Sequence, residues 1–159
     1  MALTRPPAAH EAESALLQDE LCFALYLAAR ASGTHYRPLL AELGLTYPQY
    51  LVMLVLWERG PVTVKDLGEA LSLDSGTLSP LLNRLEDAGI VDRRRSQSDG
   101  RQVKVSSTEA GNALRDRGRG VAESARKALA LHYSPAQYDG LVLSLHELAR
   151  RLRVEQSSR

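Results

Sequence analysis

The sequence predicts a mainly α-helical protein with a small β-hairpin, and three features of the chain support this fold class. Residues 63–89 hold two short amphipathic helical segments joined by a three-residue connection. Residues 90–107 hold two runs with β-branched residues on either side of a polar turn. Leucine-rich helical patterns flank both features. A helix-turn-helix followed by a basic hairpin, or wing, is typical of proteins that lie on duplex DNA.

The residues before the helix-turn-helix predict a tail and three helices. We expect a flexible tail over residues 1–13, a first helix over residues 14–31 and a short second helix over residues 35–43. A buried third helix begins at Thr46, where the sequence carries a capping signature with proline early in the helix, and it stops at Gly60.

The helix-turn-helix itself has clear ends and two distinct faces. Thr63 can cap the first helix, with Asp66 as its partner three residues on, and Gly89 is placed to end the second helix, over residues 75–88. Leucines at helical spacing form the core face of the second helix: Leu78, Leu81, Leu82 and Leu85. Its opposite face carries hydrogen-bonding groups suited to base edges and phosphates: Ser75, Thr77, Ser79, Asn83 and Arg84.

The wing is the most basic part of the chain. On its return strand Val103 and Val105 can face the domain, while Gln102 and Lys104 face outward. The wing holds five cations against two acids: Arg93, Arg94, Arg95, Arg101 and Lys104 against Asp92 and Asp99. The whole chain has a net charge of only +1, but DNA responds to the local field. For an isolated hairpin, a charge-protected edge strand is an equal alternative, whereas the preceding helix-turn-helix favours DNA binding.

Two further helices follow the wing. The first covers about residues 108–131, with Ser107 or Thr108 as its cap, and the second covers residues 134–153 before a flexible tail over residues 154–159. Leucines form one stripe along the last helix: Leu141, Leu145, Leu148 and Leu152.

The terminal helices predict a homodimer. The first helix is apolar on almost every side, and such a helix is normally buried. Because a small winged domain offers nothing to cover it, we expect residues 14–45 and 108–153 to form a twofold dimer around winged units over residues 46–107. The two recognition helices, residues 75–88 of each chain, would then lie about one DNA turn, ~34 Å, apart on a pseudopalindromic operator. An intramolecular bundle in a monomer is the alternative.

Composition narrows the class of protein. A length of 159 residues fits one domain, here residues 14–153. No apolar run reaches the ~18 residues of a membrane helix, and the first residues lack the apolar centre of a signal peptide, so we expect a cytoplasmic protein without a membrane partner. The single cysteine and four scattered histidines give no disulfide, metal or cofactor site. We recognise no catalytic motif and expect no enzyme.

Two runs of the chain resemble a known family. Residues 73–111, with DGR at the wing tip and TEAG opening the next helix, resemble the winged helix-turn-helix core of the MarR family. Residues 21–58 resemble the organic hydroperoxide sensors of that family, the OhrR repressors, of the single-cysteine type. The two resemblances together span roughly residues 16–153. They imply that Asp99 braces Arg101 and that Arg101 enters the minor groove at the wing tip.

Cys22 is the candidate regulatory residue. A lone cysteine on an apolar helix is, without context, more often inert packing than chemistry. Tyr26 lies four residues on, on the same helix face, while Tyr36 and Tyr47 belong to the segments that follow. Phenolic hydroxyls can donate to a thiolate and favour its charged form. The OhrR resemblance matches Cys22 to the peroxide-reactive cysteine and the three tyrosines to those around it, some supplied across the dimer interface.

These features together predict a DNA-binding repressor that releases its operator when an organic hydroperoxide oxidises Cys22 to sulfenic acid. With no second cysteine, the sulfenic acid must be capped by a low-molecular-weight thiol, form a sulfenamide or oxidise further. One alternative is a MarR repressor released by a phenolic or aromatic ligand, with Cys22 structural. Another is a thiol peroxidase, which the chain disfavours because it has no resolving cysteine.

Overall fold

A computed structural model describes residues 20–95 and 102–157. Predictions for the tail over residues 1–13, for the start of the first helix at residue 14, and for Asp99 and Arg101 lie outside the described residues. The helices are α2 (Leu21–Ala41), α3 (Tyr47–Arg59), α4 (Val64–Leu71), α5 (Ser75–Asp87), α6 (Glu109–Ala113), α7 (Arg115–Ala130) and α8 (Pro135–Ser157). The strands are β1 (Val62–Thr63), β2 (Val91–Arg95) and β3 (Val103–Ser107). This order confirms the predicted fold class.

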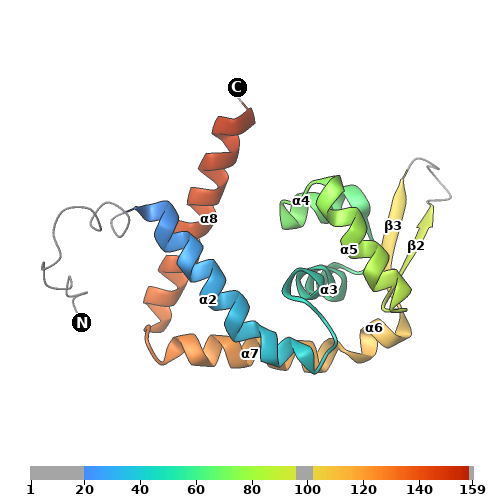
Figure 1. Cartoon of the computed structure of the whole chain (residues 1–159), viewed down its shortest axis with the longest axis horizontal. Helices are drawn as coiled ribbons and strands as arrows, with labels where there is room; N and C mark the ends of the chain where they lie inside the picture. The colour runs from blue at the N-terminus through green and yellow to red at the C-terminus, as the bar shows by residue number, and fades with distance from the viewer. Residues whose placement is uncertain (1–19, 96–101, 158–159) are drawn as a thin grey trace, which may run out of the picture.

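The elements form two parts. Helices α3, α4 and α5 pack with the three strands into the winged unit, and α2, α7 and α8 form a framework beside it (Figure 1). Helix α2 crosses α7, and α8 rises from the end of α7 (Figure 1). The framework thus presents much of α2 and α8 to the outside.

The predicted helix caps of the winged unit are confirmed. The backbone N–H of Asp66 donates to Thr63 Oγ1 at 3.0 Å at the start of α4, and the N–H of Thr46 donates to Gln49 Oε1 at 2.8 Å at the start of α3. Gly89 has a φ of 69°, which glycine adopts without strain, and it follows the end of α5. These short-range signals were sufficient to place the helix boundaries.

The predicted break between a first and a second helix was wrong, because α2 is continuous from Leu21 to Ala41. Gly33 lowers helix stability by only about 1 kcal/mol relative to alanine, whereas each added residue completes another backbone hydrogen bond. The hydroxyl of Thr34 donates to the carbonyl of Arg30 at 3.1 Å and so stays within the helix. Packing of Leu40, which is buried, anchors the end of the helix on the winged unit.

The predicted two-stranded wing was incomplete. Strand β1 adds a third strand, and the sheet order is β1-β3-β2. Val62 pairs with Val105, and Val91 pairs with Ser107, all antiparallel. Val62 and Thr63, the second of which also caps α4, are extended, so they can bond to the free edge of β3.

The helices after the wing differ from prediction at two points. The expected single helix is interrupted at Leu114, whose N–H donates to the carbonyl of Gly111 at 3.3 Å; Trp57 Nε1 donates to the same carbonyl at 3.0 Å. Helix α8 continues to Ser157, past the expected end at residue 153, since no glycine or proline interrupts it.

One core joins the winged unit to the framework. The leucines predicted to face inward from α5 are buried, apart from the half-buried Leu81. The Tyr50 hydroxyl donates to the carbonyl of Gly118 at 2.9 Å, and Trp57 lies against the same glycine. Helix α3 is therefore fixed to α7. Within the described residues, no helix combines the length and apolar character that crossing a membrane requires.

Candidate DNA-binding surface and redox site

Helix α5 presents the predicted polar face at the surface of the winged unit. Ser75, Ser79, Asn83 and Arg84 are exposed, as is Thr77. Asp74 caps the helix, because its carboxylate accepts the N–H of Thr77 at 2.8 Å and the Thr77 hydroxyl at 3.1 Å. These bonds from Thr77 lower the pKa of Asp74. The cap was missed in the sequence, although an aspartate directly before a helix is a recognisable signal.

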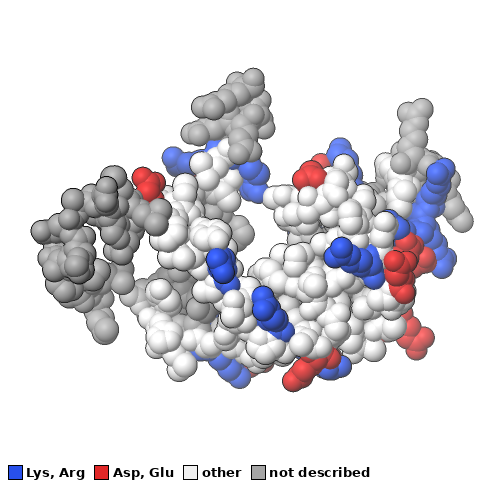
Figure 2. Space-filling view, viewed as in Figure 1, with Lys and Arg blue, Asp and Glu red and all other residues white. Residues whose placement is uncertain are grey.

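The wing divides its cations between two faces. Arg94 lies opposite Lys104 in the β2–β3 ladder, and both side chains are exposed, as is Arg95. Arg94 Nε donates to Asp92 Oδ2 at 2.5 Å. Figure 2 shows basic side chains gathered on the side of the molecule where the wing lies, with acidic side chains next to them.

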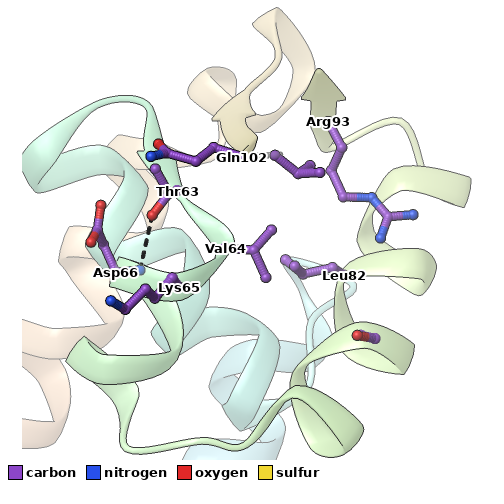
Figure 3. A pocket seen from close by; sticks show the side chains of 9 residues that line it. Thr63, Val64, Lys65, Asp66, Leu82, Arg93 and Gln102 are labelled. Atoms are coloured by element: carbon purple, nitrogen blue, oxygen red, sulfur yellow. Dashed lines mark hydrogen bonds between the residues drawn. The ribbon is translucent and has the colours of Figure 1, made fainter. Parts of the chain in front are cut away.

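Arg93 is placed differently from its neighbours. It pairs with the buried Val105, and its guanidinium contacts Glu86 and Asn83 of α5. Arg93 also lines a concavity of about 670 Å³ between the start of α4, helix α5 and the wing, with Thr63, Lys65 and Gln102 on the other side (Figure 3). Arg93 and Asn83, both predicted to bind DNA, are thus bonded to each other.

Cys22 lies near the start of α2 and is exposed. Tyr26, one turn on, is also exposed; its ring stacks on Phe23 with a centroid distance of 6.4 Å, and its hydroxyl accepts from Arg30 at 3.1 Å. A phenolic oxygen that accepts one bond still has its own proton to donate. The structure therefore leaves the Tyr26 hydroxyl able to donate to a neighbouring anion.

The other predicted tyrosines lie at the opposite end of α2. The ring centroids of Tyr36 and Tyr47 are 4.8 Å apart, and both rings lie near Tyr50. Burial, and secondarily the neighbouring phenols, raises the pKa of Tyr36 and Tyr47, and raises the pKa of Tyr50 to about 12. Tyr50 was missed, although it follows Tyr47 by three residues on one helix face.

The structure does not bring Cys22 to this tyrosine cluster within one chain. Fourteen residues of a continuous helix separate Cys22 from Tyr36, which corresponds to about 21 Å along the helix axis at 1.5 Å per residue. A hydrogen bond spans about 3 Å. Any contact between the Cys22 sulfur and Tyr36 or Tyr47 therefore needs a second copy of the chain.

The framework helices leave a broad apolar surface uncovered. Seven large aliphatic residues in the described parts of α2 and α8 are exposed: Leu21, Leu27, Leu141, Leu143, Leu145, Leu152 and Val154. Their side chains range from 41% to 70% exposed. Exposed apolar side chains in such number on two framework helices indicate an interaction site.

Comparison with known proteins identifies the family. The sequence profile of the MarR family matches residues 45–103, which include most of the winged unit. The organic hydroperoxide resistance transcriptional regulator of Bacillus subtilis is 50% identical over 101 residues, covering 64% of this chain and 69% of that protein. This chain belongs to the MarR family.

Solved structures support the assignment of this MarR chain over most of its length. Reduced AbfR bound to DNA, a Staphylococcus epidermidis protein, is 36% identical, with a TM-score of 0.74, and the match covers 89% of this chain and 95% of that one. Overoxidized AbfR bound to DNA is 34% identical, with a TM-score of 0.72 and coverage of 88% and 97%. These relatives are transcriptional regulators rather than enzymes, and the chain is a regulator of the MarR type.

Proposed function

We propose that this regulator binds a pseudopalindromic operator as a twofold homodimer and releases it when an organic hydroperoxide oxidises Cys22. The observation that carries the proposal is an exposed cysteine on α2, a helix that also exposes Leu21 and Leu27, in a family member similar to a hydroperoxide resistance regulator. The AbfR structures support a redox role, since this relative has been solved in reduced, overoxidized and disulfide forms, the first two of them bound to DNA.

The apolar surface of the framework supports the dimer. We assign dimerisation to residues 14–45 and 108–153, of which the structure describes residues 20–45 and 108–153. Burying one leucine or valine side chain contributes roughly 1.5–3 kcal/mol, so covering the exposed aliphatic residues of α2 and α8 would contribute substantially to association. A twofold axis pairs the same face of both chains, as a self-complementary interface requires.

The dimer also completes the redox site. If two α2 helices cross antiparallel, Cys22 of one protomer meets Tyr36 and Tyr47 of the other, which a single chain cannot achieve. Their raised pKa values keep both phenols protonated, so they can donate to a thiolate and stabilise it. Tyr26 adds a donor from the same chain as Cys22.

The chemistry requires one oxygen transfer and one capping step. The Cys22 thiolate attacks the terminal oxygen of the hydroperoxide; an S–O bond forms, the O–O bond breaks, and the alkoxide leaves and takes a proton to become an alcohol. Sulfur is oxidised and the peroxide is reduced. A low-molecular-weight thiol then displaces the hydroxyl of the sulfenic acid, forms a mixed disulfide and releases water. In the proposed dimer, the added bulk at Cys22 would push the two α2 helices apart.

Contacts between the framework and the winged unit can carry this displacement to DNA. Arg117 of α7 donates to the carbonyl of Glu42 at the end of α2 at 2.6 Å. Arg115, also on α7, donates to the carbonyl of Trp57 in α3 at 2.7 Å. Arg153 of α8 contacts Ser72 in the turn between α4 and α5. A shift of α2 would therefore move the recognition helices α5 of the two protomers relative to each other.

The DNA-facing groups are proposed from α5 and from the exposed cations of the wing; of these cations, Arg94 and Lys104 lie on its outward face and Arg95 lies on the face of Val103. The DNA-facing groups are Ser75, Thr77, Ser79, Asn83, Arg84, Arg94, Arg95 and Lys104. Asp99 and Arg101 remain predictions outside the described residues. The contacts of Arg93 with α5 set it apart from this group.

The test is a DNA-binding titration with a duplex selected from a random library. Reduced protein should bind with nanomolar affinity, and cumene hydroperoxide with free cysteine should release the DNA, while mass spectrometry finds Cys22 modified. Cys22→Ser should bind equally well and ignore the peroxide. Release of DNA from Cys22→Ser by peroxide would refute the sensor assignment. Release by salicylate but not by peroxide would favour a ligand-responsive repressor.

Substitution of the tyrosines tests the composite site. Tyr36→Phe and Tyr47→Phe should each slow oxidation of Cys22 by about ten- to a hundredfold, because a lost hydrogen bond to a charged group is worth roughly 1.5–3 kcal/mol. Operator affinity of the reduced protein should stay unchanged. Tyr133→Phe, at an exposed tyrosine, is the matched control and should oxidise at the wild-type rate. Equal rates for all three variants would exclude the cluster from the site.

A further inference from the structure

We propose that Arg93 is a positioning residue: Glu86 and Asn83 hold its guanidinium against α5, so it makes no phosphate contact and turns the amide donor of Asn83 toward DNA. This inference rests on the proposed DNA binding of α5 and concerns how that helix is presented. If Arg93 has this role, the wing and the recognition helix α5 act as one rigid unit.

Two of the three guanidinium nitrogens of Arg93 bond to side chains of α5. Arg93 Nε donates to Glu86 Oε2 at 2.8 Å, and Nη2 contacts the same carboxylate oxygen and donates to Asn83 Oδ1 at 2.7 Å. Figure 3 shows the Arg93 side chain extending from the wing with its guanidinium directed at α5. A planar guanidinium fixed by several acceptors has a defined position, unlike a lysine at the same place.

Burial distinguishes this pair from the neighbouring one. The Arg93 and Glu86 side chains are 26% and 36% exposed, whereas the Arg94 side chain is 83% exposed beside Asp92. Screening by water and salt is weaker for partly buried charges. Because the Arg93–Glu86 pair is partly buried, its two charges neutralise each other and the pair is retained. Arg94 is exposed and can reorient toward a phosphate.

Strand register explains why adjacent arginines differ. Successive side chains of a strand point to opposite faces. Arg93 lies across from the buried Val105, and Arg94 lies across from the exposed Lys104. The first arginine must therefore point into the space between the wing and α5, and the second must point away from it.

The amide of Asn83 is oriented by the same cluster. A guanidinium has only donors, so the amide must turn its oxygen to Arg93 and leave its NH₂ group for other partners. An asparagine reading adenine uses both its oxygen and its NH₂ group. With the oxygen held by Arg93, Asn83 presents donors, which suit the O6 and N7 acceptors of guanine.

The experiment measures operator affinity at several salt concentrations by fluorescence anisotropy, with a selected duplex and a random duplex. Arg94→Met is the matched control for Arg93→Met, because it removes the same charge from the outward face. Arg94→Met should lower the slope of log K against log salt by about 0.9, the value for one phosphate contact. Arg93→Met should leave the slope unchanged and lower the ratio of selected to random affinity by about tenfold. A slope lowered equally by Arg93→Met would overturn the inference.

Three further variants separate position from charge. Glu86→Gln should free Arg93 and raise random-duplex affinity more than Asp87→Asn, which removes the same charge one residue on. Arg93→Lys keeps the charge and should still lower the ratio of selected to random affinity. A wild-type ratio in Arg93→Lys would refute the positioning role even if Arg93→Met fails to fold. Selection repeated with Arg93→Met should shift the base contacted by Asn83 away from guanine. Failure of the wild-type protein to bind any selected duplex would instead refute the proposed function itself.

Discussion

The contact between Gly118 and Trp57 gives a sharp prediction about how the framework is attached to the winged unit. A Cβ atom added at Gly118 would lie 2.4 Å from Cζ3 and 2.6 Å from Cη2 of Trp57. The indole has little room to move, since it is 7% exposed and its Nε1 donates to the carbonyl of Gly111. Gly118→Ala should therefore displace α7 from α3 or break this hydrogen bond.

The expected loss of stability follows from these contacts. Overpacking a tight site lowers the free energy of unfolding by about 1–3 kcal/mol. Displacement of α7 would also weaken the bond from the Tyr50 hydroxyl to the Gly118 carbonyl, typically worth about 1 kcal/mol. The greater helix propensity of alanine offsets up to about 1 kcal/mol of this loss in the free energy of unfolding. We expect a net decrease of about 1–3 kcal/mol.

Gly120 provides a matched control two residues along the same helix. A Cβ atom there would have no atom within 4 Å, so Gly120→Ala should raise stability by about 0.5–1 kcal/mol. Urea unfolding followed by the fluorescence of the single tryptophan compares the variants, at one protein concentration because a dimer's stability depends on it. The reasoning is refuted if Gly118→Ala is as stable as Gly120→Ala.

Three other predictions concern the core, the α5 cap and the dimer. Tyr50→Phe should lower the free energy of unfolding by about 1 kcal/mol in the same assay, since it removes the donor to the buried Gly118 carbonyl; an unchanged midpoint would show that the bond contributes nothing. The lowered pKa of Asp74 means that its carboxylate stabilises the folded state above the unfolded value of 3.8, and that this contribution is lost as pH falls through the folded pKa. The stability gap between wild type and Asp74→Ala should accordingly be constant near neutral pH and narrow in acid, and a gap independent of pH would contradict the cap's ionic character. Leu145→Glu should shift the protein toward monomer in analytical ultracentrifugation, while Glu147→Gln, on the same helix but in an ion pair with Arg150 and Arg151, should not.

The wing illustrates how far sequence reasoning extends. Alternation along the return strand correctly put Val105 inside and Lys104 outside, because both faces of one strand follow from its period of two. The same rule could not decide the face of Arg93 alone, since that depends on which β3 residue lies across from it. Register in turn depends on the length of the turn between β2 and β3 and on packing against α5.

The sequence also predicted only part of the redox site. Sequence spacing placed Cys22 and Tyr26 on one face of a helix and found Tyr36 and Tyr47 as candidates. It did not show that α2 is unbroken, and an unbroken helix is what separates Cys22 from Tyr36 within a chain. The spacing also did not reveal that Tyr36 and Tyr47 pack with Tyr50, because residues on different helices meet only through tertiary packing.

The sequence by itself determined the features that act over a few residues: the caps at Thr46 and Thr63, the leucine face of α5 and the stop at Gly89. Hydrogen bonds within one turn and a fixed helical period set these without reference to the rest of the chain. Tertiary structure alone decided the third strand, the interruption at Leu114 and the pairing of Arg93 with Glu86. In each case the partner is distant in sequence or lies on another element, and only packing of the two surfaces fixes which groups meet.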